Sequence, residues 1–448
     1  AQYTASLGSG SGTVNDTLAA GEQRIIPDVL TYLRQKGLQI PTGGSQGGTL
    51  LLAFYGATSD AAPAVTARTS ALTGPPLPVG RAGLAYSAID PATGTDGSLI
   101  LYGLRSNASD RSNVAVFNTS SAPVSVRVTA FSGAGDGAST VIASSDALPA
   151  WGWKQYNGVL DGPAYPSGWV KIDRVSGART YFSAYAVIND NVTNDGSFVL
   201  PTTAPPLPAY SNVPVLVETS AFASELTLAN SGATTATIAL TYQESLGGSQ
   251  TGTAMVMLPP KTQLIQPNAI AWLRSQGIPI GPAGAAGYAG SLHLLVSGAS
   301  PTDVYAGART SSLAPGGGQF GLFTPPNPPG EEGSTEVYIY GLRADAENRS
   351  NVAVVHVGDP EDGPITLSVQ AYDGNAGGAA KGAAASVTLT PGQWQQLNGF
   401  LSQQGIANGW VKITRTAGIA NWIAYGVIND GGAPGQRTGD GAYVPMSR

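Results

Sequence analysis

The chain contains 448 residues, of which 42% are hydrophobic and only 11% are charged, and its formal net charge is −6. This length exceeds what one hydrophobic core serves and indicates three or four domains, while the hydrophobic content excludes a disordered chain. The acidic balance excludes a basic surface and therefore nucleic acid as a partner. The chain has no cysteine, which excludes thiolate catalysis and disulfides, and no apolar stretch is long enough for a membrane span.

The sequence repeats itself with a period of about 240 residues. Trp169–Ile172 recurs as Trp410–Ile413, and a different pattern, Leu18–Leu38, returns as Leu258–Ile278. Two kinds of domain, called A and B, therefore alternate along the chain. The predicted order is A-B-A-B, with a first segment at residues 1–90, a second at 91–205, a third at 206–330 and a fourth at 331–448.

In the first segment, the run from Ile26 to Leu33 predicts a short helix. Pro27 suits the first helical turn, and Gly37 suits a left-handed stop. Ile26, Leu30 and Leu33 fall on one face of this helix, which we expect to pack on a small core.

The first segment is shorter at its start than the third. Residues 3–8 match residues 242–247. Residues 213–241, which precede the second of these runs, have no counterpart before residue 3. We therefore expect the first domain to lack its opening strands, which leaves a sheet edge open to pairing with another chain. The predicted assembly edge is Tyr3, Ala5 and Leu7.

Two interpretations of this shortening follow. In one, another molecule supplies the missing strands by donor-strand complementation, and the protein is a subunit of an extracellular polymer. In the other, the strands belong to the same polypeptide and are cleaved from it or lie outside this sequence. A head-to-tail contact between the last domain and the first would also propagate a filament.

Alternating strands dominate the later segments. Val124–Ala130 in the second segment and Ile365–Ala371 in the fourth have period two, and Asn157–Leu160 predicts a short helix or turn. In the third segment Glu225–Asn230 and Ala236–Tyr242 form a predicted hairpin. The fold class that follows is all-β, with four tandem immunoglobulin-like β-sandwich domains, each with one short helix. Their proline-rich connections, residues 202–208 and 325–329, predict a semi-rigid string.

Motifs for catalysis are missing from the sequence. Its two histidines, His293 and His356, lie in predicted strands and have no histidine at the repeat-related positions. No nucleophile elbow, phosphate-binding loop or zinc-protease helix occurs. We expect no catalytic residues, no cofactor-binding residues and no enzymatic activity.

The most polar constellation lies near the end of each B segment. Its carboxylates, together with neighbouring Asn side chains, can hold a calcium ion; the alternative is that these residues form Asx turns. The predicted metal-binding residues are Asp190, Asp195, Asp430 and Asp440.

Six tryptophans lie in the B segments. Exposed, they would make a platform for glycans; the alternative is that they fill cores and domain interfaces. They are Trp151, Trp153, Trp169, Trp394, Trp410 and Trp422.

The patterns Leu226–Asn230 with Leu240–Tyr242, and Gly409–Ile413 with Ala424–Asp430, resemble tandem immunoglobulin-like or fibronectin-III-like β-sandwich repeats of large secreted bacterial surface proteins. The resemblance covers the whole chain and implies a structural or adhesive role. We expect an extracellular or cell-surface structural protein, a subunit of a filament or surface assembly that binds copies of itself through strand complementation or head-to-tail contacts. The alternative is an adhesin, or a carbohydrate-binding accessory module of a larger secreted protein, with glycans as partners.

Overall fold

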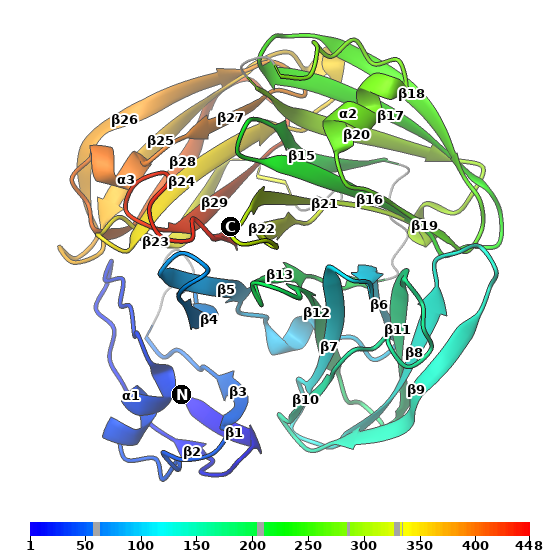
Figure 1. The fold of residues 1–448 in the computed structure, drawn as a ribbon. Helices are drawn as coiled ribbons and strands as arrows, with labels where there is room; N and C mark the ends of the chain where they lie inside the picture. The colour runs from blue at the N-terminus through cyan, green and yellow to red at the C-terminus, as the bar shows by residue number, and fades with distance from the viewer. Residues whose placement is uncertain (57–62, 204–209, 285–286, 327–331, 334) are drawn as a thin grey trace.

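The computed structural model describes residues 1–56, 63–203, 210–284, 287–326, 332–333 and 335–448. They form antiparallel sheets with three short α-helices, which confirms the all-β prediction (Figure 1). The predicted proline-rich connections fall largely outside the described residues, at 204–209 and 327–331.

The first segment contains two small sheets and one helix. Its strands are β1 (Gln2–Leu7), β2 (Gly12–Thr13), β3 (Gly47–Leu51), β4 (Thr66–Thr73) and β5 (Gly80–Ser87). β1 lies between β2 and β3, and β4 pairs with β5. The core is correspondingly small and includes Tyr3 and Leu33.

Helix α1 (Val29–Gln35) starts two residues later than Pro27. Asp28 caps it because the Asp28 carboxylate accepts a hydrogen bond of 2.9 Å from the Thr31 amide. Pro27 therefore lies before the cap and not in the first turn. Gly37, with φ of +104°, ends the helix as predicted.

The second segment has two sheets on either side of one core. The strands are β6 (Ser98–Arg105), β7 (Asp110–Asn118), β8 (Val124–Ser132), β9 (Ser139–Leu148), β10 (Trp153–Tyr156), β11 (Ser167–Ser176), β12 (Phe182–Asp190), β13 (Gly196–Val199) and β14 (Thr202–Thr203). One sheet has the order β10-β7-β12-β13 and the other β14-β6-β11-β8-β9. Alternate residues of facing strands, such as Val116 and Ile172, are fully buried between them.

Of the short helix or turn predicted at Asn157–Leu160, the second segment forms the turn and not the helix, since residues 159–164 make consecutive turns. Gly162 and Pro163 interrupt this stretch, and Pro163 has no amide for a helical hydrogen bond. The fourth segment has Gln403 and Gln404 at the corresponding place, and helix α3 (Phe400–Gln403) forms there.

The third segment shows the A type with two opposed faces. Its elements are β15 (Tyr210–Glu218), β16 (Ala223–Asn230), β17 (Ala236–Leu246), β18 (Thr251–Leu258), β19 (Thr262–Gln266), α2 (Ala269–Ser275), β20 (Tyr288–Ser297), β21 (Val304–Leu313) and β22 (Gln319–Thr324). The order β18-β17-β20-β15 makes one face, and β16 lies between β19 and β21 in the other. A tight turn joins β15 to β16, so this pair links the two faces.

The fourth segment repeats the design of the second. Its strands are β23 (Glu336–Arg343), β24 (Asn348–His356), β25 (Ile365–Asp373), β26 (Ala379–Leu389), β27 (Trp394–Leu397), β28 (Asn408–Ala417), β29 (Trp422–Asp430) and β30 (Gly441–Pro445). One sheet has the order β23-β28-β25-β26 and the other β27-β24-β29-β30.

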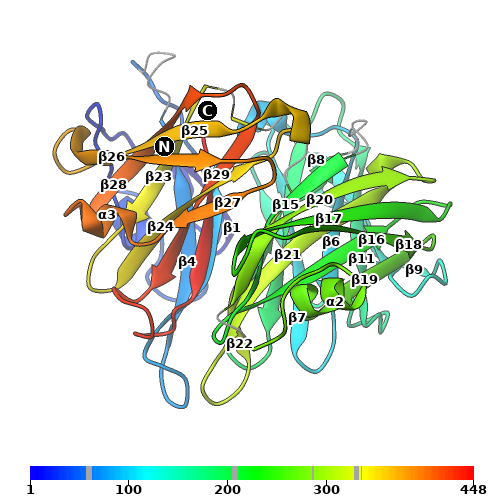
Figure 2. The same ribbon diagram turned by 90° about the horizontal axis from the view of Figure 1, so that it is seen from above.

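The four segments close into a ring. The last strands of the segments, β5, β13, β22 and β30, meet at its centre, each touching two of the others (Figure 1). Seen from above, the fourth segment lies beside the third, and β4 runs next to strands of the fourth segment (Figure 2). The first and last segments are therefore in contact, and the chain is a closed ring where the proline-rich connections predicted a string.

Repeat-related residues make the contacts between segments. Gln263 accepts a hydrogen bond from the Gly103 amide at 2.8 Å, and Gln23 accepts one from the Gly341 amide at 2.7 Å. Both glutamines also donate to the carbonyl of the next residue in that strand, at 3.0 Å in each case. The ring therefore has an approximate twofold symmetry, in which the contact of the first and fourth segments copies that of the third and second.

Candidate functional site

Two aspartates predicted from the sequence lie side by side at the ring centre. Asp195 precedes β13 and accepts hydrogen bonds from the amides of Gly83 (3.1 Å) and Gly321 (2.7 Å). Asp440 precedes β30 and accepts one from the same Gly83 amide at 2.9 Å, and it forms an ion pair with Arg68 at 3.2 Å. Their two carboxyl groups thus connect strands of all four segments.

The other two predicted aspartates hold the same strands from further out. Asp190 accepts a hydrogen bond from the Gln319 amide of β22 at 2.9 Å. Asp430 accepts one from the Arg81 amide of β5 at 3.1 Å. Each also accepts bonds from its own loop, for example from the amide of Thr193 at 2.7 Å. These are the Asx turns that the sequence left as the alternative to a metal site.

Asp195 and Asp440 share a proton-dependent contact. Both side chains are completely buried, and Oδ1 of Asp195 and Oδ2 of Asp440 accept hydrogen bonds from the same Gly83 amide. Burial is the main cause that raises the pKa of both carboxyl groups, and the charge of Asp195 raises the pKa of Asp440 further. Arg68 and Arg309 oppose these shifts. Because the two carboxyl groups interact, their protons are lost as a pair, and the second negative charge forms only against the repulsion of the first.

The oxygens of these aspartates are largely occupied by the protein itself. Within the described ranges, no three His, Cys, Asp or Glu side chains come together as a metal-binding set. Backbone amides donate to both oxygens of Asp195 and to Oδ2 of Asp440, whereas Oδ1 of Asp440 is buried without a hydrogen bond among the described residues. The calcium site remains a sequence prediction.

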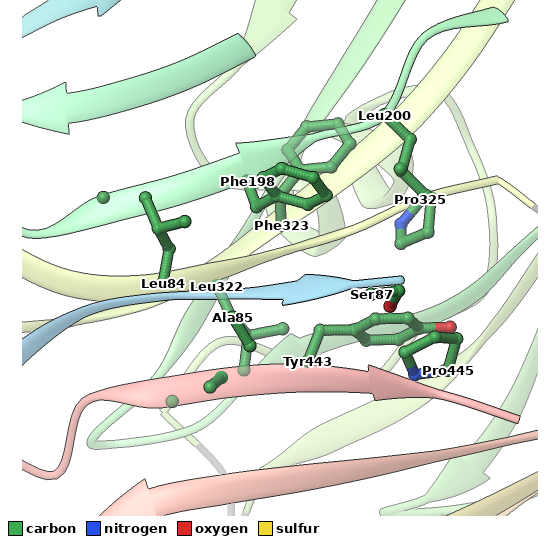
Figure 3. A pocket seen from close by; sticks show the side chains of 13 residues that line it. Leu84, Ala85, Ser87, Phe198, Leu200, Leu322, Phe323, Pro325, Tyr443 and Pro445 are labelled. Atoms are coloured by element: carbon green, nitrogen blue, oxygen red, sulfur yellow. The ribbon is translucent and has the colours of Figure 1, made fainter. Parts of the chain in front are cut away.

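A small apolar cavity lies beside the carboxyl pair (Figure 3). Its volume of about 30 Å³ is enough for roughly one water molecule. Strands of all four segments line it, with Leu84, Phe198, Leu322, Phe323 and Tyr443 among the lining residues. Such a space packs the ring centre and does not accept a substrate-sized ligand.

His356 has a structural role. It is buried in β24, its Nδ1 accepts a hydrogen bond from the Gly358 amide at 3.2 Å, and its Nε2 lies 2.9 Å from the Gly363 carbonyl oxygen. Burial lowers its pKa. His293 lies in β20, and burial lowers its pKa too.

The first segment leaves open the place that β15 and β16 fill in the third. β20 pairs with β15, whereas its counterpart β3 pairs only with β1 in the part of the chain that the structure describes. β21 pairs with both β16 and β22, whereas its counterpart β4 pairs only with β5 among those residues. Residues 22–26, which correspond to β19, form no strand. We call this place, between β3, β4 and residues 22–26, the open slot.

Apolar side chains around the open slot are exposed where their counterparts are covered. Leu50 is 37% exposed and its counterpart Leu292 is fully buried; Val29 is 42% exposed and its counterpart Ala269 is fully buried. The counterpart residues pack in the core to which β15 and β16 contribute Leu216, Leu226 and Leu228.

The predicted assembly residues lie one strand away from the open edge. Tyr3, Ala5 and Leu7 are on β1, which has β3 along its length and β2 opposite its first residues. Tyr3 is buried in the core, and Leu7 is 47% exposed, close to the 48% of its counterpart Leu246. Among the described residues, the edge of β3 that faces away from β1 has no strand beside it. Sequence comparison shows that strands are missing but does not show which neighbour they would pair with.

The predicted aromatic platform is divided between core and surface. Trp169 and Trp422 are buried. In the fourth segment, Trp410 stacks on Tyr372 with ring centroids 4.0 Å apart, and Tyr338 and Tyr340 lie next to it. All four rings are half-buried, and we call them the aromatic cluster.

No protein-family model matches this chain, and no curated protein sequence matches it. The described part of the chain also contains no helix that is long and apolar enough to cross a membrane.

The carboxyl pair predicts a pH-dependent stability. Because the folded-state pKa is raised, the folded protein holds a proton on this pair more tightly than the unfolded chain does, and this stabilisation is lost as pH rises through the folded-state pKa. We expect the melting temperature to fall as the pH rises from roughly 4, the pKa of an unfolded aspartate, through the folded-state pKa of Asp195 of about 6. In Asp440→Asn the amide can donate to Asp195 and accept from Gly83, so this fall should be smaller.

Melting curves at a series of pH values check this, with Asp96→Asn as the control because Asp96 is exposed at the surface. Identical pH profiles for the native chain and Asp440→Asn would contradict the assignment of the raised pKa to the carboxyl pair.

Proposed function

We propose that this chain is an extracellular structural protein, a subunit of a filament or surface assembly, and that strands of a neighbouring chain complete its first segment. The open slot carries this proposal. A sheet edge with unpaired backbone groups, next to exposed apolar side chains, is a template for strand addition. The third segment supports it because it shows how β15 and β16 complete the same design.

The closed ring favours strand addition over a head-to-tail contact as the way in which one chain binds the next. The surfaces of the first and fourth segments that a head-to-tail contact would use already bind each other within the chain, through Gln23 and its hydrogen bond to Gly341. The open slot remains as the place for a neighbour. In this proposal the four segments are immunoglobulin-like sandwich domains with the boundaries predicted from the sequence.

A charge on the slot floor should prevent assembly. Leu50→Lys places an ammonium group where the counterpart Leu292 is fully buried, and burying an unpaired charge costs several kcal/mol. The variant should keep its fold, since Leu50 is 37% exposed in the chain alone. We expect it to lose incorporation into native assemblies.

The matched control is Leu7→Lys. The counterpart Leu246 is 48% exposed in the complete third segment, so completion of the first segment does not bury Leu7. Negative-stain imaging of native extracellular material, labelled for the added chain, measures incorporation. Single particles without repeating arrays, or equal incorporation of Leu50→Lys and Leu7→Lys, would reject the proposal.

The aromatic cluster favours a second candidate function, an adhesin or carbohydrate-binding module. Half-buried Trp and Tyr rings offer apolar faces with polar tips, as sugar-binding surfaces do. If this is the function, the monomeric chain binds glycans and Trp410→Ala loses most of that affinity, whereas Trp153→Ala does not. Titration of the monomer with a glycan panel tests this, and an absence of binding to any of them argues against it.

A further inference from the structure

The contact between the second and third segments contains a buried ion pair. Arg105 of β6 donates two hydrogen bonds to the two carboxylate oxygens of Glu225 in β16. The side chains of both residues are largely buried, and Asp110 lies 3.9 Å from Arg105 as a second acid. Glu225 is on one of the two strands that have no counterpart in the first segment.

Arg343 occupies the place of Arg105 at the matching contact of the fourth and first segments. Nε of Arg343 is buried without a partner, and so is Nε of Arg105. The difference lies at the terminal nitrogens, which bind Glu225 in Arg105 and have no hydrogen bond or ion pair among the described residues in Arg343. Asn348 stands where Asp110 stands in the second segment. Burial, and after it the charge of Arg68, lowers the pKa of Arg343, whereas the charge of Asp345 raises it. Among the described residues, this partly buried arginine therefore has no counterpart of the Glu225 carboxylate.

A second arginine shows the same difference. Arg274 of α2 donates to Glu218 of β15 at 2.7 Å and to the Gly281 carbonyl at 2.7 Å. Its counterpart in α1, Arg34, donates to the carbonyls of Ile40 and Pro41 but has no acidic partner among the described residues. Glu218 again belongs to the strand pair that the first segment lacks.

A third difference between the two contacts concerns an uncharged, aromatic side chain. Tyr102 is 1% exposed, its hydroxyl lies 2.7 Å from that of Ser231 just after β16, and it stacks on Tyr305. Its counterpart Tyr340 belongs to the half-buried aromatic cluster of the fourth segment. The ring of Tyr102 is covered by Tyr305 of β21, where the first segment has Ala64, whereas a strand in the place of β16 would bring a partner to the hydroxyl.

We propose that the open slot binds a β-hairpin that carries two carboxylates, placed as Glu218 and Glu225 are, which pair with Arg34 and Arg343. This inference rests on the proposed function and names the chemistry of the partner. One strand adds to the edge of β3, and the other lies between β4 and residues 22–26. Charge complementarity selects the hairpin, because a hairpin without the second acid leaves Arg343 desolvated and unpaired.

A copy of this chain is a poor donor. To lend β15 and β16 it would have to withdraw Leu216, Leu226 and Leu228 from its own core, where each is fully buried. A hairpin that is not packed in a core of its own has no such cost.

Entry of the hairpin requires a movement of β4. At Gly103 the nearest outside atom to an added Cβ would be Oγ1 of Thr227 in β16, at 3.7 Å, whereas at Gly341 it would be Oγ1 of Thr66 in β4, at 3.0 Å. β4 thus leans into part of the place that β16 fills in the third segment. Binding should therefore change hydrogen exchange in β4 as well as at the new pairing sites.

The test uses a synthetic peptide of residues 211–231 and the full chain. Fluorescence anisotropy of the labelled peptide measures affinity, and hydrogen exchange of residues 22–26 and of β3 reports whether strands have paired there. The Glu225→Gln peptide and the Glu218→Gln peptide should each bind roughly tenfold more weakly than the native peptide. A scrambled peptide of the same composition controls for non-specific adhesion.

Arg343→Met in the full chain completes the design. Its melting temperature should equal or exceed that of the native chain because the arginine has no partner to lose, whereas Arg105→Met should lower it by several degrees. Arg343→Met should bind the native and the Glu225→Gln peptides equally. Arg127→Gln removes an exposed charge from the second segment and should change neither affinity.

The outcomes separate the two proposals. Equal binding of all three hairpin peptides, with protection of residues 22–26, overturns the charge selection and leaves strand addition standing. No binding of the native peptide overturns strand addition at the slot and the charge selection with it. A loss of affinity for Glu225→Gln that persists in Arg343→Met overturns the assignment of Arg343 as the partner.

Discussion

The structure depends on the hydrogen bonds that the buried Asp195 and Asp440 accept at the ring centre. The backbone amides of β5 and β22 point at these carboxyl groups, and the carboxyl groups belong to the loops before β13 and β30. Each carboxyl group therefore binds across a segment boundary. A buried carboxylate that lost these amides would bear a large desolvation cost, so the four terminal strands and the carboxyl pair stabilise one another.

The twofold pattern of the ring makes its exceptions informative. Gln23 and Gln263 make equivalent pairs of hydrogen bonds to a neighbouring segment. In the same way, the hydroxyl groups of Ser6 and Ser245 accept hydrogen bonds from the backbone amides of the equivalent residues Trp153 and Trp394. The open slot departs from this agreement. Among the described residues, the terminal nitrogens of Arg343 have no partner, residues 22–26 form no strand, and Tyr340 is only half-buried. All of them lie where β15 and β16 would be, and this agreement supports a hairpin as the partner.

Local patterns in the sequence predicted many of the strands and turns. The period-two runs of β8, β16 and β25 form strands, and the stop at Gly37 forms as expected, because these features depend on neighbouring residues. After Asn157 a turn forms and not a helix because Gly162 and Pro163 interrupt the stretch, a local signal that the repeat comparison concealed. Asp190 and Asp430 were identified as a polar constellation, but their hydrogen bonds to β22 and β5 could not be predicted, since the partners are more than a hundred residues away in sequence.

By itself, the sequence determined the all-β class, the alternation of two repeat types and the shortening of the first one, because hydrophobic periodicity and self-similarity are properties of the linear chain. The closure of the segments into a ring, the meeting of Asp195 and Asp440 at its centre and the free edge of β3 could be seen only in the folded protein. These depend on which surfaces lie together after folding. The unpaired Arg343 is the clearest example, because its residue type equals that of Arg105 and only the missing neighbour distinguishes the two.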